Sequence, residues 1–195
     1  MSTNITWHHG FLAREERWRR LGHSGATVWF TGLPGSGKST IATTVEARLV
    51  KARRSAYVLD GDNLRHGLTA DLGFSDSDRE ANVKRVAEVA RLFADAGTVV
   101  LVSLISPFRS GRDHARRLHQ EAGLPFFEVW VDTPLDVCEQ RDPKGLYARA
   151  RRGEIPGLTG VDGTYEPPER PDLVIATAST SAESAAETVV TLLPA

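Results

Sequence analysis

Residues 32–39, with the sequence GLPGSGKS, match the pattern G-x-x-x-x-G-K-[ST], and this glycine-rich loop constrains the fold more than any other feature. An apolar run at 27–31 precedes it, and a helix is expected from Lys38 onward. Glycines let backbone N–H groups converge on phosphates, and the helix N-terminus adds a favourable dipole. Lys38 can reach the β- and γ-phosphates, and the Ser39 hydroxyl can ligate magnesium. The loop predicts nucleoside triphosphate binding rather than a structural turn, but it does not separate a kinase from a GTPase, an ATPase or a regulatory binder.

The rest of the chain alternates strands with helices. Strands are expected at 27–31, 56–59, 98–104, 126–131 and 173–176, and helices at 79–96 and 111–122 and after residues 38, 133 and 180. This alternation predicts a three-layer α/β domain with a mainly parallel five-stranded sheet and helices on both faces. Residues 142–170 are rich in glycine, proline and charge, which predicts a mobile lid with one short helix. We expect an arm at 1–24 and a single domain at 25–195.

Three helix starts have sequence signals of their own. Ser77 and Glu80 form a capping box before the helix at 79–96. Thr133 is expected to cap the next helix, with Pro134 at its first position. Thr180 is expected to begin the last helix. In the arm, Phe11, Trp18 and Leu21 approximate one face of a short amphipathic helix, which either packs on its own domain or covers a site or a second subunit.

Composition excludes several partners and compartments. The 24 basic and 25 acidic residues leave a net charge of −1, which argues against nucleic acid and against an anionic membrane surface as partners. Cys138 is the single cysteine, so no intrachain disulfide can form and a reducing compartment fits. The apolar run at 99–105 is too short to span a membrane, and the polar N-terminus lacks a signal-peptide core. We therefore expect a cytoplasmic protein.

An acidic turn, Asp60-Gly-Asp62-Asn, ends the second expected strand. In open parallel sheets ligands gather at the carboxyl ends of the strands, where this turn lies. Two carboxylates beside a triphosphate are useful if they bind magnesium or hold a hydroxyl group, although an ordinary acidic turn would have the same sequence. Arg65 follows closely and can pair with an anion.

Arg79 lies on the same helical line as Val86 and Ala90, and Asn82 lies about 60° from that line. Because this line faces the core, both polar side chains point inward at the first turn of the helix. A buried charge needs a partner. That partner is either a carboxylate of the acidic turn or an anionic substrate, and we favour the substrate.

Seven further segments, taken in order, resemble the adenylyl-sulfate kinase family. They are 59–68 (LDGDNLRHGL), 71–75 (DLGFS), 78–82 (DREAN), 92–97 (LFADAG), 105–109 (ISPFR), 138–147 (CEQRDPKGLY) and 157–160 (GLTG). The resemblance runs from about Trp7 to the last helix. It implies a P-loop kinase that phosphorylates the 3′-hydroxyl of adenosine 5′-phosphosulfate with ATP and magnesium, giving 3′-phosphoadenosine 5′-phosphosulfate and ADP.

The resemblance also implies roles for individual residues. Lys38, Asp62 and Ser106 are the expected catalytic residues; Gly35, Ser36, Gly37, Lys38, Ser39, Thr40 and Thr180 bind ATP; and Ser39 and Asp60 hold the metal. The substrate is expected to contact Asp62, Arg65, Phe74, Arg79, Asn82, Ile105, Ser106, Lys144, Gly157 and Leu158. Ser106 is described in this family as a phosphoserine intermediate, yet direct in-line transfer needs no such step and the sequence shows no base beside it.

Two positions depart from the family pattern. Leu158 stands where phenylalanine is usual, which removes a stacking ring, and Pro34 stands where serine is common, which removes one N–H donor from the loop. The family suggests a homodimer, and the sequence leaves open whether a sulfurylase associates with it. Two rival readings are a related P-loop kinase for another small hydroxyl compound and a non-catalytic nucleotide-binding module. Phe74 and Arg79 suit a nucleotide-like anion, and the presence of Lys38 and Asp62 favours catalysis.

Overall fold

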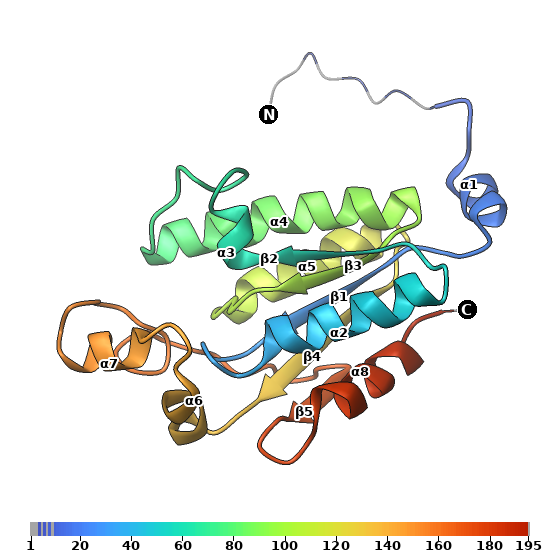
Figure 1. Cartoon of the computed structure of the whole chain (residues 1–195). Helices are drawn as coiled ribbons and strands as arrows, with labels where there is room; N and C mark the ends of the chain where they lie inside the picture. Colours follow the sequence, from blue (N-terminus) through green and yellow to red (C-terminus); the bar gives the residue numbers. More distant parts are fainter. Residues whose placement is uncertain (1–3, 5, 7, 9, 195) are drawn as a thin grey trace.

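A five-stranded parallel sheet forms the centre of the computed structural model, which describes residues 4, 6, 8 and 10–194 (Figure 1). The strands are β1 (Ala26–Thr31), β2 (Ala56–Asp60), β3 (Val99–Ser103), β4 (Phe126–Asp132) and β5 (Leu173–Ala176). They pair in the order β2-β3-β1-β4-β5, with every pair parallel. All five strands therefore present their carboxyl ends at one edge, and the expected sheet is confirmed.

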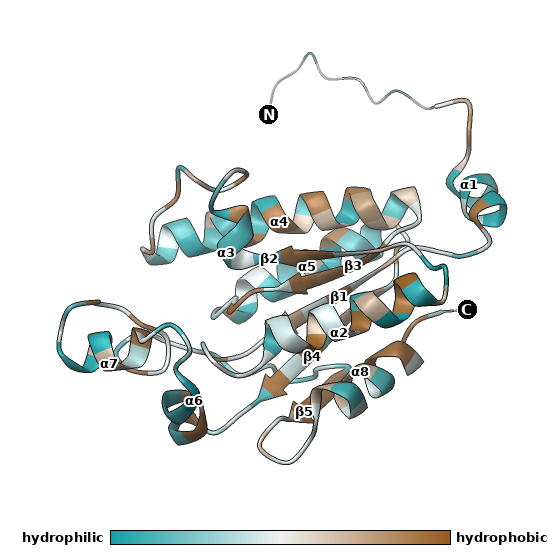
Figure 2. Ribbon diagram, in the orientation of Figure 1, coloured by the Kyte–Doolittle hydropathy of each residue, from teal (hydrophilic) through white to brown (hydrophobic). Residues whose placement is uncertain are grey.

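Helices cover both faces of this sheet. The helices of the described residues are α1 (Arg14–Leu21), α2 (Lys38–Lys51), α3 (Gly61–Leu64), α4 (Asp76–Ala96), α5 (Arg109–Glu121), α6 (Leu135–Arg141), α7 (Leu146–Arg151) and α8 (Ala182–Thr191), of which α2, α4, α5 and α8 pack on the sheet. Val28 and Phe30 of β1 face α2 and α8, whereas Trp29 faces α4 and α5. Side chains of a strand alternate between faces, and both faces here are buried. The strands are accordingly apolar through most of their length (Figure 2).

The helix starts differ from the sequence prediction at three points. Helix α4 begins at Asp76, and Ser75 rather than Ser77 caps it by accepting from the backbone N–H of Asp78 at 3.2 Å. Pro134 precedes α6 and no side chain caps that helix, because the Thr133 hydroxyl donates to the Ser36 carbonyl at 3.0 Å instead. Ser75 and Ser77 have the same local signal, and the packing of α4 decides between them, whereas at α6 a tertiary contact occupies the hydroxyl that was expected to cap the helix.

The last helix differs in the same way. Ser181 caps α8 by accepting from the backbone N–H of Ser184 at 3.2 Å, so Thr180, expected to begin the helix, lies just outside it. Thr180 is therefore free of a capping role.

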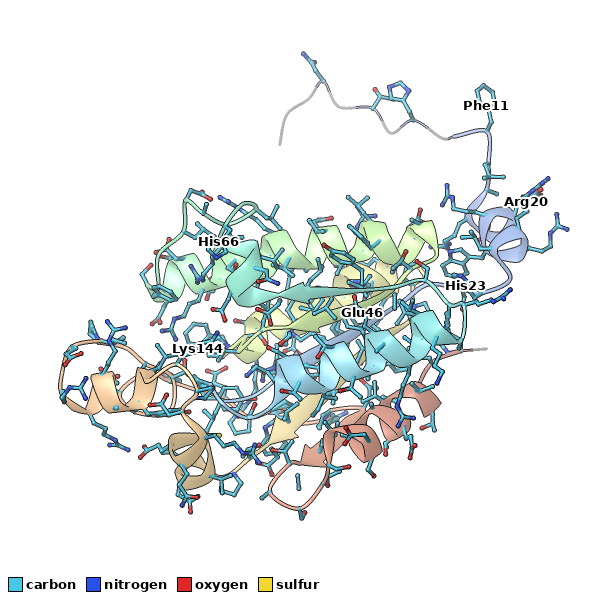
Figure 3. All side chains as sticks on the ribbon, in the orientation of Figure 1. Phe11, Arg20, His23, Glu46, His66 and Lys144 are labelled. Atoms are coloured by element: carbon cyan, nitrogen blue, oxygen red, sulfur yellow. The ribbon has the colours of Figure 1, made fainter. Side chains whose placement is uncertain are left out.

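The arm packs on its own domain through α1. The indole N–H of Trp18 donates to the carbonyl of Asp95 at the end of α4 at 3.0 Å, and Arg17 donates to the same carbonyl at 3.1 Å. Phe11 precedes the helix and is fully exposed, so the expected apolar face of Phe11, Trp18 and Leu21 does not form (Figure 3). Trp7, where the family resemblance starts, lies outside the described residues.

Residues 142–170 contain one short helix, α7, as expected; α7 and α6 lie beyond the carboxyl ends of the strands, and the end of the segment returns beside α5, where Glu166 and Glu169 contact Arg112 and Arg109 (Figure 1). We call residues 142–170 the lid. Cys138, Tyr147 and Leu158 form a small buried cluster that joins the lid to α6. In the described part of the chain, no helix is long and apolar enough to span a membrane.

Candidate active site

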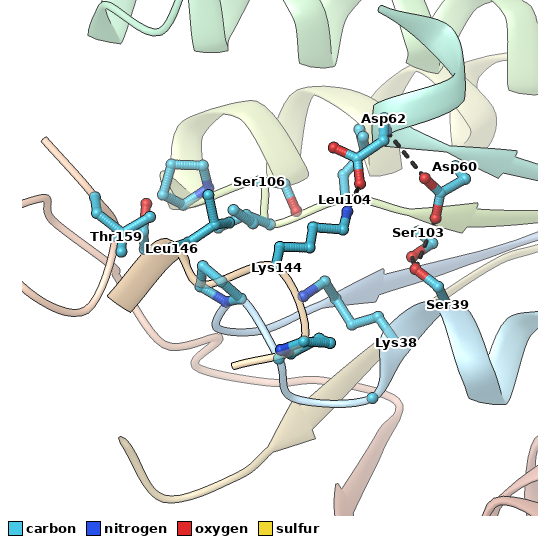
Figure 4. Close-up of a pocket in the computed structure, with 18 of the residues that line it drawn as sticks. Lys38, Ser39, Asp60, Asp62, Ser103, Leu104, Ser106, Lys144, Leu146 and Thr159 are labelled. Atoms are coloured by element: carbon cyan, nitrogen blue, oxygen red, sulfur yellow. Dashed lines mark hydrogen bonds and ion pairs between the residues drawn. The ribbon is translucent and has the colours of Figure 1, made fainter. Parts of the chain in front are cut away.

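A cavity of about 1300 Å³ opens where the carboxyl ends of the strands meet the lid (Figure 4). Single small-molecule pockets are typically about 300–1,000 Å³, so this cavity has room for more than one ligand. Its walls come from the glycine-rich loop (the P-loop, residues 32–39), the acidic turn, the start of α4, the segment after β3, and the lid.

The P-loop turns tightly between β1 and α2. Gly35 and Gly37 have φ angles of 74° and 102°, a region that L-residues rarely adopt. A Cβ atom on Gly35 would also lie 3.1 Å from the carbonyl oxygen of Cys138. Helix α2 begins at Lys38, so its free N–H groups point into the loop. This arrangement is a cradle for phosphate groups.

Lys38 is buried at the bottom of the cradle, with 8% of its surface exposed. Its ammonium group donates to the carbonyls of Gly32 and Leu33 at 3.0 and 2.8 Å. Burial lowers the pKa of Lys38 to about 8, although Asp60 and the Cys138 thiol act in the opposite direction. A bound polyphosphate would stabilise the charged ammonium, so the site is prepared for an anion.

Three oxygen atoms meet at the first turn of α2. The Ser39 hydroxyl donates to Asp60 Oδ2 at 2.6 Å and lies 3.1 Å from the Ser103 hydroxyl (Figure 4). Magnesium prefers hard oxygen ligands and is usually held by one or two carboxylates plus substrate phosphates. Among the described residues there is no cluster of three or more His, Cys, Asp or Glu side chains that could hold a metal unaided. These oxygens therefore fit magnesium bound together with a nucleotide.

Asp62 stands across the cavity from the P-loop. Its backbone N–H donates to Asp60 Oδ1 at 3.0 Å, which fixes the turn. Its carboxylate pairs with the ammonium group of Lys144 from the lid, and more than half of each side chain is exposed (Figure 4). The pair joins the lid to the acidic turn, and an exposed pair of this kind separates at little cost.

Arg79 also joins the lid to the body. Its guanidinium donates to the carbonyl of Gly157 at 2.6 Å and to the Thr159 hydroxyl at 2.8 Å. The possible buried salt bridge from Arg79 to Asp60 or Asp62 does not form in the structure. Helix α4 instead directs Arg79 toward the lid side of the cavity.

A positively charged wall with one aromatic ring lies beside Arg79. The guanidinium of Arg65 stacks 4.1 Å above the ring of Phe74, whose side chain is exposed to the cavity. Burial and the nearby Arg79 charge lower the pKa of Arg65. Asn82 is buried and its Oδ1 has no partner among the described residues. Such a wall favours an anion that carries a planar ring.

The segment after β3 forms the floor of the cavity. The Ile105 carbonyl accepts a hydrogen bond from the Thr31 hydroxyl at 2.7 Å. Ser106 is buried, and its φ angle of 41° lies in the left-handed region. Its hydroxyl accepts a hydrogen bond from the indole N–H of Trp29 at 3.1 Å.

The structure brings nearly all the residues expected at the site to this one cavity. Those that line it are Gly35, Gly37, Lys38, Ser39, Thr40, Asp60, Asp62, Arg65, Phe74, Arg79, Asn82, Ile105, Ser106, Lys144, Gly157, Leu158 and Thr180. Ser36 is fully buried instead, and its carbonyl accepts hydrogen bonds that hold the loop.

Sequence reasoning missed Ser103, described above, and two further residues at this site. Arg141 donates to the Thr177 carbonyl at 2.8 Å and to its hydroxyl at 2.9 Å, and both residues line the cavity beside Gly37. Arg141 lies within the segment 138–147 that carries the family resemblance, which was the available signal. Thr177 follows β5 directly, so its position at the carboxyl edge of the sheet was a second signal.

Comparison with known proteins places the chain in a family. The family model described as adenylylsulphate kinase matches residues 24–176. An adenylyl-sulfate kinase of Clostridium kluyveri is 53% identical over 90% of this chain and 87% of its own length. Another, from Acaryochloris marina, is 49% identical over 98% of this chain and 93% of its own length.

Solved structures agree. The APS kinase of Mycobacterium tuberculosis, determined in complex with AMPPNP and APS, has a TM-score of 0.85 and 55% identity, covering 87% of this chain and 98% of its own. A gluconokinase of Sinorhizobium meliloti, with 21% identity and a TM-score of 0.58, shares the fold alone. With most of its length matched by sequence and by structure, this chain belongs to the adenylylsulphate kinase family, and its activity is the ATP-dependent phosphorylation of adenylyl sulfate.

Proposed function

We propose that the chain transfers the γ-phosphoryl group of ATP to the 3′-hydroxyl of adenosine 5′-phosphosulfate within the cavity described above. The observation that carries this proposal is that one cavity contains two different binding regions, one at each end. One end is the phosphate cradle with Lys38 and Ser39, and the other is the positive wall of Arg65 and Arg79 with the ring of Phe74. A cradle alone fits any nucleotide-binding module, whereas the second end supplies a place for an anionic nucleotide acceptor.

At the ATP end, the P-loop N–H groups and Lys38 bind the triphosphate, with Gly35, Gly37 and Thr40 close to it. Phosphoryl transfer is chiefly positioning and charge neutralisation. Lys38 neutralises charge that grows on the γ-phosphoryl group, and Thr180 lies near the adenine. Ser39 and Asp60 would hold magnesium, which supplies charge neutralisation when bound.

At the acceptor end, Asp62 orients the 3′-hydroxyl of the substrate and accepts its proton. For this it must separate from Lys144, whose ammonium group is then free to contact the anionic substrate. The buried Oδ1 of Asn82 supports a polar partner in the ligand, because buried polar atoms without partners are costly. We expect this arrangement to bring the acceptor oxygen in line with the γ-phosphorus.

The purine of the acceptor lies against Phe74, with Leu158 of the lid on its other side. Phe74 has 68% of its surface exposed and Leu158 has 8%, so the ring is the more available of the two. Gly157 and Ile105 complete the walls around the substrate. Leu158 excludes water but offers no ring face for stacking.

The test is an Asp62→Asn variant assayed with Mg-ATP and adenylyl sulfate. Loss of a positioned general base costs about 10²–10⁴ in rate, so kcat should fall by at least about a hundredfold. Asp71→Asn is the matched control, because Asp71 is an exposed carboxylate paired with Arg85 away from the cavity. An Asp62→Asn variant with wild-type kcat would refute the role of Asp62.

The proposal includes the oligomeric state of the protein and its location in the cell. We expect a homodimer, which the fully exposed Phe11 of the arm supports, and an association with a sulfurylase. A hexameric APS kinase of Thiobacillus denitrificans, with a TM-score of 0.64 and 30% identity, shows that a related chain assembles. Light scattering would measure the mass in solution, and a monomer at micromolar concentration would contradict the dimer. A cytoplasmic location fits the single buried cysteine.

A further inference from the structure

Trp29 reaches the active site from inside the core. It lies on β1 with no exposed surface and faces the helix layer of α4 and α5. Its indole N–H donates to the Ser106 hydroxyl oxygen at 3.1 Å, across 77 positions of the chain. Ser106 lines the cavity, so a core residue is linked by one hydrogen bond to a group at the ligand surface.

The direction of this hydrogen bond fixes what the Ser106 hydroxyl can do. An indole N–H can only donate, so the serine oxygen accepts with one of its lone pairs. The serine proton is then free, and among the described residues this hydroxyl makes no hydrogen bond as a donor. The hydroxyl is therefore prepared to donate a hydrogen bond to a ligand in the cavity.

The backbone of Ser106 is held as firmly as its side chain. Its φ angle of 41° is unfavourable for a residue with a Cβ atom and persists only where surroundings hold it. Arg112, which is 1% exposed, donates to the Ser106 carbonyl at 2.6 Å. The same guanidinium donates to Glu128 at 2.7 Å and to the carbonyl of Glu166 in the lid at 2.6 Å.

We propose that Trp29 and Arg112 are positioning residues that hold Ser106 as a hydrogen-bond donor to an oxygen atom of bound adenylyl sulfate. The inference rests on the proposed function, because it takes this cavity as the place where the acceptor binds. It also assigns Ser106 a non-covalent role. The described surroundings of its hydroxyl contain no carboxylate or imidazole in hydrogen-bonding contact that would remove its proton.

The test is Trp29→Phe, which keeps a buried aromatic ring and removes the N–H group. Without its donor the Ser106 hydroxyl can rotate and turn its proton inward. We expect KM for adenylyl sulfate to rise about tenfold, the scale of one lost hydrogen bond, while KM for ATP stays unchanged. Trp130→Phe on the neighbouring strand β4 is the matched control and should leave both KM values unchanged. A lower stability alone would not change one KM and spare the other.

Arg112→Lys tests the backbone contact. A lysine keeps a positive charge beside Glu128, but its three N–H donors sit on one nitrogen and cannot reproduce the planar fork that reaches Glu128, Ser106 and Glu166 from three nitrogens. The same selective rise in KM for adenylyl sulfate is expected. An equal change in both KM values would mean that Arg112 only stabilises the fold.

A double-mutant cycle with Ser106→Ala separates this inference from the proposed function. Ser106→Ala should raise KM for adenylyl sulfate, and Trp29→Phe should add nothing in that background. If Ser106→Ala leaves this KM unchanged, the proposed placement of the substrate at Ser106 is wrong. If Ser106→Ala raises it but Trp29→Phe does not, only the positioning role of Trp29 is wrong.

The indole N–H resonance of Trp29, assigned by substituting the other tryptophans, decides the matter if Trp29→Phe does not fold. In the otherwise unaltered protein it should shift when adenylyl sulfate is added. In Ser106→Ala the added ligand should leave it unmoved. If the chemical shift of this resonance does not change on addition of adenylyl sulfate to the protein with Ser106 intact, the inference is overturned.

Discussion

The buried ammonium group of Lys38 makes ATP binding dependent on pH. In the free protein burial lowers its pKa to about 8, because the group lies at the bottom of the P-loop, where its hydrogen-bond partners are the neutral carbonyls of Gly32 and Leu33 and the Ser36 hydroxyl. A bound triphosphate adds negative charge beside it and favours the protonated form. The ATP complex therefore needs the Lys38 proton. Raising the pH from 7 to 9 removes this proton from the free protein.

The size of the effect follows from the pKa. With a value of about 8, roughly nine-tenths of the free protein is protonated at pH 7 and roughly a tenth at pH 9. If only the protonated site binds ATP tightly, the apparent Kd should rise about tenfold over this range. Near pH 8, binding should take up roughly half a proton per ATP.

Isothermal titration calorimetry in buffers of different ionisation enthalpy measures both the Kd and the proton uptake. Lys38→Met is the control, because it has no ionisable group and reports the titration of ATP itself. An apparent Kd that is equal at pH 7 and pH 9 after this correction, or a protein that releases protons at pH 8, would refute the reasoning.

Four substitutions test the catalytic and substrate-binding residues. Lys38→Ala should keep the fold, judged by circular dichroism, and lose more than nine-tenths of kcat, because a lost preorganised electrostatic contact typically costs about 10²-fold or more. Phe74→Ala should weaken adenylyl sulfate binding about tenfold, since base–aromatic stacking contributes roughly 1–3 kcal/mol, with ATP affinity unchanged in the same calorimeter; equal losses for both ligands would contradict the purine placement. Leu158→Phe should tighten adenylyl sulfate binding, and weaker binding would show that a second ring does not fit. Ser106→Ala should keep measurable turnover in a coupled ADP assay, and trapping a phosphoserine that forms and decays at the turnover rate would overturn direct transfer.

The pH dependence of stability has the same origin as that of ATP binding. Between about pH 8 and the usual lysine pKa of 10.5, the unfolded chain keeps the Lys38 proton while the folded chain has lost it. This group therefore makes the free energy of unfolding rise with pH in that window, and Lys38→Met should remove that contribution in urea titrations.

Much of the fold could be predicted because its signals are local. Residues 32–39 combine glycine spacing with a strand before and a helix after, and each of these features depends on neighbours in the sequence. The apolar run at 27–31 predicts a strand buried on both faces, which β1 is. The helix starts were less certain, because Ser75 and Ser77 both suit a cap and only the packing of α4 decides between them.

The contacts across the cavity could not be read from the sequence. Lys144 and Asp62 are 82 positions apart, and either could have paired with another charge. Arg79 was correctly placed on the inward face of its helix, and its guanidinium donates to Thr159 and Gly157 of the lid and to the carbonyl of Phe74, not to the acidic turn. Contacts of this kind depend on where the lid lies relative to the sheet. The hydrophobic periodicity of the sequence predicts helices and strands but not the position of the lid.

Incubating the protein with Mg-ATP and adenylyl sulfate, and locating the new phosphate by phosphorus NMR, tests the central claim most directly. We predict one equivalent of ADP for each 3′-phosphoadenosine 5′-phosphosulfate formed, with the phosphate on the 3′ oxygen. Folded protein that binds both ligands and yields no such product, or places the phosphate elsewhere, would contradict the account.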